Sequence, residues 1–208
     1  MMNYVILAIF LILRLVPVLS TFCAPETVYA TCNMEPISGN SVRGTVDFRQ
    51  RLDWGCWPVG GLQIKVNLTG LPTDTGIIAH GFHIHEYGDL SNGCTGTGSH
   101  YNPFNRNHGG RYSRERHVGD LGNVVQDKRG NIYTDFSALL PTLGGPLSVL
   151  GRAVVIHEKP DDLGRGNNAE SKRTGNAGSR LGCCIISRSN GDGWIGDRWG
   201  GDSDEYDP

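Results

Sequence analysis

The sequence predicts an all-β protein, an antiparallel Greek-key β-barrel or sandwich with two long functional loops. Short runs of alternating apolar and polar residues recur along the chain, and 30 glycines among 208 residues supply many turns. No long stretch has helical periodicity. This combination favours two packed antiparallel layers over a helical or mixed fold. Without its leader the chain keeps about 185 residues, enough for one domain with a proper core.

The first 20 residues have the composition of a signal peptide. An apolar run of about ten residues ends at Arg14, too short to span a bilayer cleanly. Cleavage after Ser20 or Ala24 fits this leader, and Ala30 lies far from the apolar run. No Lys or Arg precedes that run, so a signal anchor is the alternative. Residues 21–39 follow as an N-terminal extension.

Strand signals begin near residue 42. Val42, Gly44, Val46 and Phe48 alternate with polar residues, which is the period of a strand with one buried face. Further strands are predicted at 62–68, 123–125, 132–136 and 150–157, with a turn at 128–131.

The second of these strands carries a glycosylation sequon. Asn67 faces outward in the alternation and begins Asn-Leu-Thr, so a glycan there is sterically allowed. The segment before this strand, DWGCWPVGG, has no function that the sequence indicates.

The stretch from Gly81 to Asp120 is chemically the most distinctive. It holds five of the seven histidines: His83, His85, His100, His108 and His117. The first two are two residues apart on a strand, so both rings point to one face. The other three lie in a long Gly/Asn/Ser-rich loop closed by Asp120. Surface histidines on a polar loop are the alternative, but this concentration favours a metal centre. Imidazole suits copper and zinc, and a carboxylate among histidines favours zinc.

Two further features have ambiguous chemistry by themselves. His157 ends the apolar run RAVVIH, where a lone histidine is more often structural. Residues 161–180 form a second polar loop, whose charges are typical of a solvated surface.

Six cysteines behind a leader indicate disulfides. Three bonds among six cysteines allow 15 connectivities. Cys183 and Cys184 are neighbours on an apparent strand, so their side chains leave opposite faces and need different partners.

The chain ends in a Gly/Asp-rich tail, residues 189–208, with six acidic residues and one arginine. Its composition predicts disorder. The whole chain has a net charge of −2, which gives no indication of nucleic-acid binding.

Several motifs resemble the copper,zinc superoxide dismutase family, in the family's order: GFHIHEYGD, HYNP, HVGDLGN, GRAVVIHEKPDDLGRG and GNAGSRLGCC. The resemblance covers residues 40–188. The cysteines at both ends make the chain more similar to the secreted branch. The resemblance therefore implies an enzyme of the extracellular space that converts superoxide to oxygen and hydrogen peroxide.

The resemblance also implies one copper and one zinc ion per subunit. The copper ligands it implies are His83, His85, His100 and His157. The zinc ligands it implies are His100, His108, His117 and Asp120. His100 bridges both metals and takes a proton when its bond to copper breaks. His80 matches a structural histidine and is left out of the metal set.

In the second polar loop, the resemblance identifies Asp161 as a carboxylate that links a copper histidine to a zinc histidine. Thr174 and Arg180 match residues that narrow and charge the mouth of the copper channel. Arg173 replaces the usual Lys, and Ala169 stands where many members have Glu.

The resemblance pairs Cys94 with Cys183, and its secreted branch pairs Cys32 with Cys184. Cys23 and Cys56 remain. They pair with each other or with another chain, or Cys23 leaves with the leader.

Family members of the cytosolic branch are two-fold dimers through an apolar patch, which Ile185 fits. Arg188 falls where the family usually has an apolar residue. Secreted vertebrate relatives have a basic, matrix-binding tail, so this acidic tail predicts no heparin-type matrix binding, and no stable membrane anchor is expected.

The competing function is a non-catalytic metal-binding or copper chaperone domain. Such domains usually lose a copper ligand or the channel arginine, and this chain keeps all of them.

Overall fold

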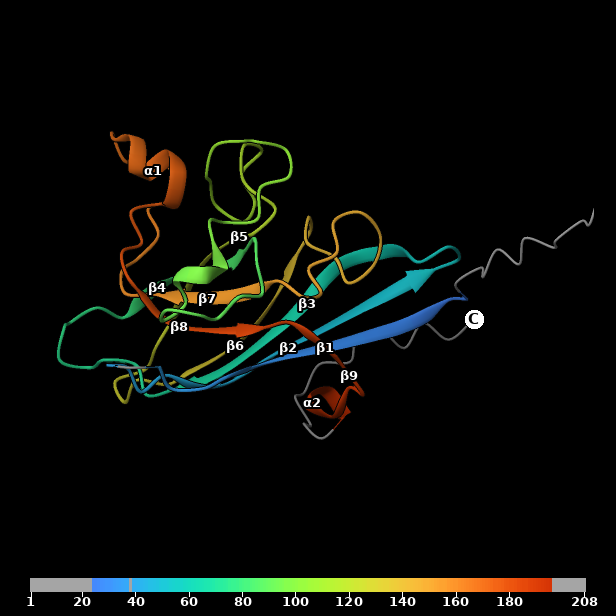
Figure 1. Cartoon of the computed structure of the whole chain (residues 1–208), viewed down its shortest axis with the longest axis horizontal. Coiled ribbons are helices and arrows are strands. Elements are labelled where there is room, and N and C mark those ends of the chain that lie inside the picture. Colours follow the sequence, from blue (N-terminus) through green and yellow to red (C-terminus); the bar gives the residue numbers. More distant parts are fainter. Residues whose placement is uncertain (1–23, 38, 196–208) are drawn as a thin grey trace, which may run out of the picture.

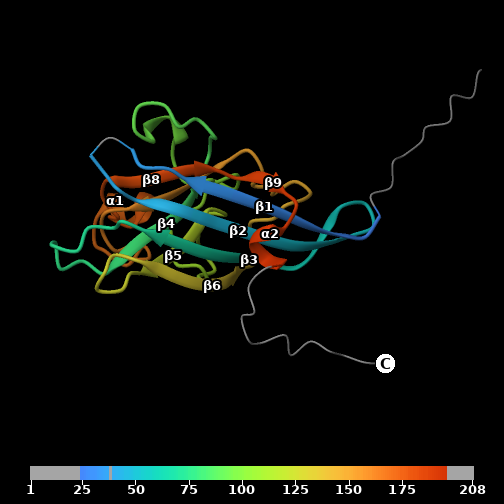
Figure 2. The same ribbon diagram turned by 90° about the horizontal axis from the view of Figure 1, so that it is seen from below.

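The computed structural model describes residues 24–37 and 39–195. Their strands form two antiparallel sheets that pack face to face (Figures 1 and 2). One sheet has the strand order β6-β3-β2-β1-β9, and the other has the order β5-β4-β7-β8. The all-β, antiparallel prediction is therefore confirmed.

The five-stranded sheet contains β1 (Glu26–Met34), β2 (Arg43–Asp53), β3 (Trp57–Thr69), β6 (Ile132–Ala138) and β9 (Ser187–Ser189). The four-stranded sheet contains β4 (Ala79–His85), β5 (Asp120–Val125), β7 (Ala153–His157) and β8 (Arg180–Ile185). The described helices are short: η1 (Thr95–Thr97), α1 (Ala169–Thr174) and α2 (Asp192–Ile195). None of them has the length and apolarity needed to cross a membrane.

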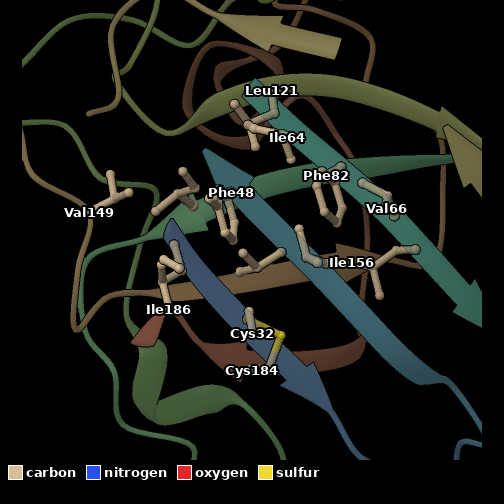
Figure 3. Packing of buried hydrophobic residues seen from close by; sticks show 14 of the residues in the cluster. Cys32, Phe48, Ile64, Val66, Phe82, Leu121, Val149, Ile156, Cys184 and Ile186 are labelled. Carbon is tan, nitrogen blue, oxygen red and sulfur yellow. A yellow bond between two sulfur atoms is a disulfide. The ribbon is translucent and has the colours of Figure 1, made fainter. Parts of the chain in front are cut away.

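The core fills the space between the sheets (Figure 3). Phe48 and Ile64 from one sheet meet Phe82 and Ile156 from the other, and all four are fully buried. Each such side chain stabilises the fold by about 1.5–3 kcal/mol through burial alone. Strand β4 contributes alternate residues to this core, which leaves His83 and His85 on its opposite face. The packed core therefore fixes the backbone from which the histidines project.

Both long loops lie over the outer side of the four-stranded sheet (Figure 1). They span residues 86–119 and 158–179, and the second contains α1. Strand pairing of β4 with β7 brings the two loops together, although they lie far apart in the sequence. The metal centre is expected where these loops cover the outer face of β4 and β7.

The N-terminal extension predicted at residues 21–39 contains a strand of the five-stranded sheet. Strand β1 lies in the predicted N-terminal extension, yet it pairs with both β2 and β9. Val28, Ala30, Cys32 and Met34 alternate along it and are buried. The same period-2 pattern that predicts the other strands is present in this segment.

The predicted disordered tail is likewise ordered over its first residues, 189–195. Trp194 lies over the sheet, and the centroid of its ring is 4.6 Å from the guanidinium carbon of Arg49. The Lys65 ammonium donates to the Gly193 carbonyl at 3.1 Å. One aromatic side chain anchors a segment whose average composition predicted disorder. Residues 196–208 lie outside the described part of the chain.

The DWGCWPVGG insertion forms the end of the β2–β3 hairpin. Trp54 and Trp57 are exposed at its tip, and the pairing shifts register between Arg49 and Arg51. Cys56 is disulfide-bonded. The leader and Cys23 lie outside the described residues.

The structure contains both disulfides that the resemblance implies. Cys32–Cys184 joins β1 to β8 across the core, and Cys94–Cys183 joins the first long loop to β8 (Figure 3 shows the former). Cys184 lies in the main core, while Cys183 lies with Cys94 and Val155 in a small separate cluster. The two neighbouring cysteines thus point to opposite faces, as a strand requires.

Removing the loop disulfide should destabilise the protein strongly. Cys94 and Cys183 are 89 residues apart, and the chain-entropy estimate for a loop of that size is about 4–5 kcal/mol. The double variant Cys94→Ser, Cys183→Ser should lower the free energy of unfolding by up to that amount. Denaturant titration of metal-free protein measures it, with peptide mapping to verify that Cys32–Cys184 is intact. An unchanged unfolding midpoint would contradict the prediction.

Candidate metal centre

The functional side chains come from three strand ends and the first long loop. His83 and His85 are on β4, and His157 is the last residue of β7. His100 is brought in by a single β-bridge to His85. The structure therefore gathers residues from positions 83 to 157 into one buried cluster.

Four histidines form the first group, called here the four-histidine group: His83, His85, His100 and His157. One ring nitrogen of each lies within 4.8 Å of the others, and all four residues are buried. The His85 Nε2 and His157 Nε2 atoms are 3.3 Å apart. His83 Nδ1 and His100 Nε2 have no hydrogen-bond partner.

The second group, called here the His–Asp group, is formed by His100, His108, His117 and Asp120. The three Nδ1 atoms lie 2.9, 2.9 and 3.1 Å from Asp120 Oδ1. In a tetrahedral zinc site with bonds of about 2.0–2.1 Å, ligand atoms are about 3.3 Å apart. The observed separations are close to that value.

His83 also lies near the His–Asp group but is engaged differently. Its Nε2 is 3.0 Å from Asp161 Oδ2, and its unpartnered Nδ1 belongs with the four-histidine group. His117 has no such alternative, since its Nδ1 faces Asp120. His117 is therefore the third histidine of the His–Asp group.

The outward nitrogens of the rings are anchored by oxygen acceptors. His85 Nδ1 is 2.9 Å from Gly98 O, and His157 Nδ1 is 3.2 Å from Gly178 O. His117 Nε2 is 2.9 Å from Arg106 O. Asp161 completes the set, because its Oδ1 lies 2.7 Å from His108 Nε2 while its other oxygen faces His83. An acceptor on the outer nitrogen places the proton there and leaves the inner lone pair free for a metal.

His100 differs from the other five rings. Its Nδ1 faces Asp120, and its buried Nε2 has no partner. Both nitrogens therefore point inward, one to each group. This arrangement suits a ring shared between two ions.

The residues fit two metal ions. A buried nitrogen without a partner costs free energy, and this structure has such atoms on His83, His100 and His108. His108 Nδ1 approaches Asp120 Oδ1 at 2.9 Å without hydrogen-bond geometry. A cation at each group would satisfy all of them, and the all-imidazole and imidazole–carboxylate donor sets suit copper and zinc respectively.

Burial favours the neutral form of three of these rings. It lowers the pKa of His85 and of His100 well below the usual value, and neighbouring histidines add to the effect. Burial and the nearby His83 lower the pKa of His157 to about 3. Neutral imidazoles keep the lone pairs that metal binding requires.

The carboxylates of Asp120 and Asp161 instead favour the protonated form of a neighbouring ring. Burial lowers the pKa of His108, but hydrogen bonds to Asp120 and Asp161 outweigh it and raise that pKa to about 9. Burial raises the pKa of both carboxyls, and their bonds to histidines more than reverse this. Both aspartates are therefore ionised and supply the negative charge that a divalent cation needs.

A cavity of about 520 Å³ leads from solvent to the four-histidine group. Its lining includes His85, His100, His157, Thr174 and Arg180. The copper-channel residues predicted from the sequence are thus gathered at one opening.

Arg180 is held in this cavity by the turn at residues 94–98. Its Nη1 donates to Thr97 Oγ1 at 2.9 Å and to the Cys94 carbonyl, and its Nη2 donates to Gly98 O at 2.6 Å. Gly98 also accepts from His85, so one turn positions both side chains. Nothing in the local sequence pattern indicated Thr97, whose hydroxyl is the acceptor, and the carbonyls of Cys94 and Gly98 have no residue signature at all.

The mouth of the cavity contains a charge-paired trio. Glu170 lies 2.5 Å from Arg173, and Thr174 donates to the same carboxylate at 2.6 Å. The helix α1 that carries them begins at Asn168, whose side chain accepts from the Ser171 amide. Arg173 is thereby largely neutralised, whereas Arg180 has no carboxylate partner among the described residues.

His80 lies outside both groups. It is fully buried, with Nδ1 2.8 Å from His157 O and Nε2 2.9 Å from Gln126 Oε1. It supports the backbone of His157 rather than offering a nitrogen to the centre.

Comparison with known proteins agrees with this geometry. Residues 42–186 match the family model for copper/zinc superoxide dismutase. The chain is 44% identical over 153 residues to superoxide dismutase [Cu-Zn] 5 of Dictyostelium discoideum, covering 74% of this chain and 95% of that protein. It is 47% identical over 145 residues to an extracellular superoxide dismutase [Cu-Zn] of Drosophila melanogaster, and the match covers 70% of this chain and 75% of that protein. It is 40% identical over 173 residues to the extracellular superoxide dismutase [Cu-Zn] of Rattus norvegicus, and the match covers 80% of this chain and 66% of that protein.

Proposed function

The chain belongs to the copper/zinc superoxide dismutase family, and from that membership we infer that it converts two superoxide anions and two protons into oxygen and hydrogen peroxide. The observation that carries this function is the complete pair of buried groups beside a cavity with an arginine at its wall. A non-catalytic relative would not need the open cavity and the unpaired cation.

The four-histidine group would hold copper, and the His–Asp group would hold zinc. Bound copper would supply the alternation between two oxidation states by which one superoxide loses an electron and another gains one, while zinc would hold its ligands in place. Asp161 binds a ring from each group, so it fixes the orientation of one relative to the other.

Arg180 draws the anionic substrate to the centre. The whole chain has a net charge of −2, so attraction must be local. The half-buried guanidinium lies in the cavity wall with His85 and His157. A positive charge in a low-dielectric cavity can raise the association rate by ~10–10³, an effect for which this enzyme family is itself an established example.

His100 is the residue suited to deliver a proton. Its Nε2 faces the four-histidine group and has no protein partner, so a proton can be held there. Asp120 binds the other nitrogen and keeps the ring oriented during the transfer. The proton reaches the reduced product from a fixed position at the inner end of the cavity.

Metal analysis combined with an activity assay tests this function. The purified protein should bind about one copper and one zinc and should remove superoxide. Metal binding without activity would favour the non-catalytic alternative, and copper without zinc would favour a copper-only enzyme.

Asp161→Asn should weaken binding of both metals. The amide keeps one acceptor but turns an N–H₂ toward the other ring, which then loses its anchor. Loss of such an outer partner typically costs about 10–100-fold in metal affinity. Competition with a chelator measures both affinities, and Asp162→Asn, which faces Ser171 and Asn176, is the matched control. Equal affinities in the two variants would contradict the role of Asp161.

The protein is secreted into the extracellular space in this proposal. Support comes from the signal-like first 20 residues, the two described disulfides and the extracellular relatives. Asn67 is exposed on the outer face of β3, beside Tyr133, and would carry a glycan. Expression in a secreting host, with a glycosidase-sensitive mass that Asn67→Gln abolishes, tests both parts. The acidic tail would not bind a heparin-type matrix, and no stable membrane anchor would remain after cleavage.

A homodimer is the proposed assembly. Ile185 is 37% exposed, and it lies next to Gly88, where an added side chain would meet the Gly151 carbonyl and the Ile185 side chain. Arg188 lies on β9, within 3.5 Å of Glu26. Sedimentation should give a dimer for the wild type and a monomer for Ile185→Glu.

A further inference from the structure

A second cleft lies beside the metal centre, next to His100 and His117. It has a volume of about 590 Å³. It shares only Ser99, His100 and Arg173 with the cavity that leads to Arg180. One wall comes from the loop of residues 101–117, called here the zinc-side loop, and the other comes from α1. Nothing in the proposed reaction uses this cleft.

The lining of this cleft is cationic. Of its described residues three are positively charged and none is a carboxylate: Arg106, Lys172 and Arg173. Arg106 lies 3.8 Å from Glu115, and Arg173 is paired with Glu170. Lys172 donates to the Gly164 carbonyl and forms no ion pair with any described residue. The cleft therefore keeps a positive charge after its neighbours are counted.

The chemistry of these side chains selects an oxyanion. Guanidinium groups bind tetrahedral and planar oxyanions through two parallel N–H bonds, and a lysine ammonium adds a point charge. Lys172 supplies the charge without a carboxylate partner, and the two arginines supply further N–H donors. A tetrahedral oxyanion has enough oxygens to accept from all three side chains at once, whereas diatomic superoxide does not. The cleft is also larger than such an anion, so water can fill the remainder.

The backbone of the same residues supports the zinc ligands. The Arg106 carbonyl accepts from the His117 ring at 2.9 Å. The Lys172 carbonyl accepts from the His108 amide at 2.8 Å. An anion that contacts both side chains would hold the zinc-side loop against α1 at the two points that fix these histidines.

We propose that this cleft binds a small tetrahedral oxyanion of the phosphate class, and that the bound anion slows the loss of zinc. The binding part stands on the cleft alone, and the effect on zinc rests on the proposed His–Asp zinc site. A protein that binds no zinc would refute the proposed His–Asp zinc site, whereas a zinc-loaded protein that does not respond to phosphate would refute only this inference.

Two measurements on the full-length, metal-loaded protein test the proposal. Calorimetry with inorganic phosphate, at constant ionic strength in chloride, should show one site with a Kd of about 1 mM or tighter. Zinc transfer to an excess of a chromogenic chelator should slow about tenfold at a phosphate concentration about nine times that Kd, if zinc leaves only from the anion-free protein.

Variants locate the site. Arg106→Ala and Lys172→Ala should each abolish the phosphate effect, measured as the ratio of zinc-release rates with and without phosphate in the same protein. Lys172→Arg should keep it, and so should Lys128→Ala, which removes an exposed lysine from a distant turn. Arg180→Ile should also keep it, because Arg180 lines the other cavity.

Three outcomes would overturn the proposal. The first is equal binding of phosphate to wild type and Lys172→Ala. The second is loss of binding in Arg180→Ile alone, which would assign the anion to the copper-side cavity. Binding of a sulfated disaccharide without binding of phosphate would indicate a polysaccharide site instead.

Discussion

Replacing His85 by alanine should abolish activity and leave zinc in place. His85 supplies one of four nitrogens to the four-histidine group and none to the His–Asp group. Loss of a direct ligand should exceed the 10–100-fold cost of losing an outer partner. Activity should fall at least about 100-fold, a barrier increase of about 2.7 kcal/mol.

The reciprocal variant is the matched control. His117→Ala removes a ring from the His–Asp group, and its nitrogens face Asp120 and Arg106 rather than the copper side. Elemental analysis should show copper lost and zinc kept in the first variant, and the reverse in the second. Full activity of His85→Ala, or equal loss of both metals in both variants, would contradict the division into two groups.

Substitution of Arg180 should have the second largest effect. Arg180→Ile removes the charge from the cavity wall and should lower activity about tenfold or more, at least ~1.4 kcal/mol in barrier height. Arg180→Lys should lower it only modestly, because the charge remains but the planar fork that reaches Thr97 and Gly98 does not. Arg180→Glu should be the worst, since it repels the anion. Activity assays at matched metal content measure all three.

Two controls separate attraction from loop support. Arg173→Ile removes a cation from the same cavity, but one whose side chain is 70% exposed at its mouth, so solvent screening should make the effect smaller. Wild-type activity should also fall as salt rises, since screening at 0.15 M limits charge interactions to about 8 Å. If the Arg180 variants lose copper, the residue acts by holding the turn that anchors His85. If the Arg180 variants keep both metals and the wild-type rate, Arg180 has only a structural role.

Local sequence patterns determined much of the fold and the centre. The period-2 alternation at residues 42–48 and 62–68 predicted two central strands, because side chains of a strand alternate whatever its partners are. His83 and His85 followed the same rule onto one face. The same pattern is present in residues 28–34, but the predicted strands began near residue 42, where the resemblance begins, and residues 21–39 were left as an extension.

The tertiary structure decided what local patterns cannot encode. His157 by itself resembled a structural histidine, and pairing of β7 with β4 brings it beside His85. Likewise, only folding shows that Trp194 anchors a polar tail to the sheet. Fifteen cysteine connectivities were open, and the strand register selected two of the bonds by bringing Cys32 and Cys94 to opposite faces of β8.

The sequence by itself determined the donor types and the two residues that share a strand face, since these depend on composition and on spacing within one strand. Only the tertiary structure decided which nitrogen of each ring points inward. For His85, His157 and His117 that choice depends on the backbone carbonyls of Gly98, Gly178 and Arg106, which lie more than ten residues away in the sequence. A carbonyl is the same in every residue, so its position is a property of the fold and leaves no trace in the sequence.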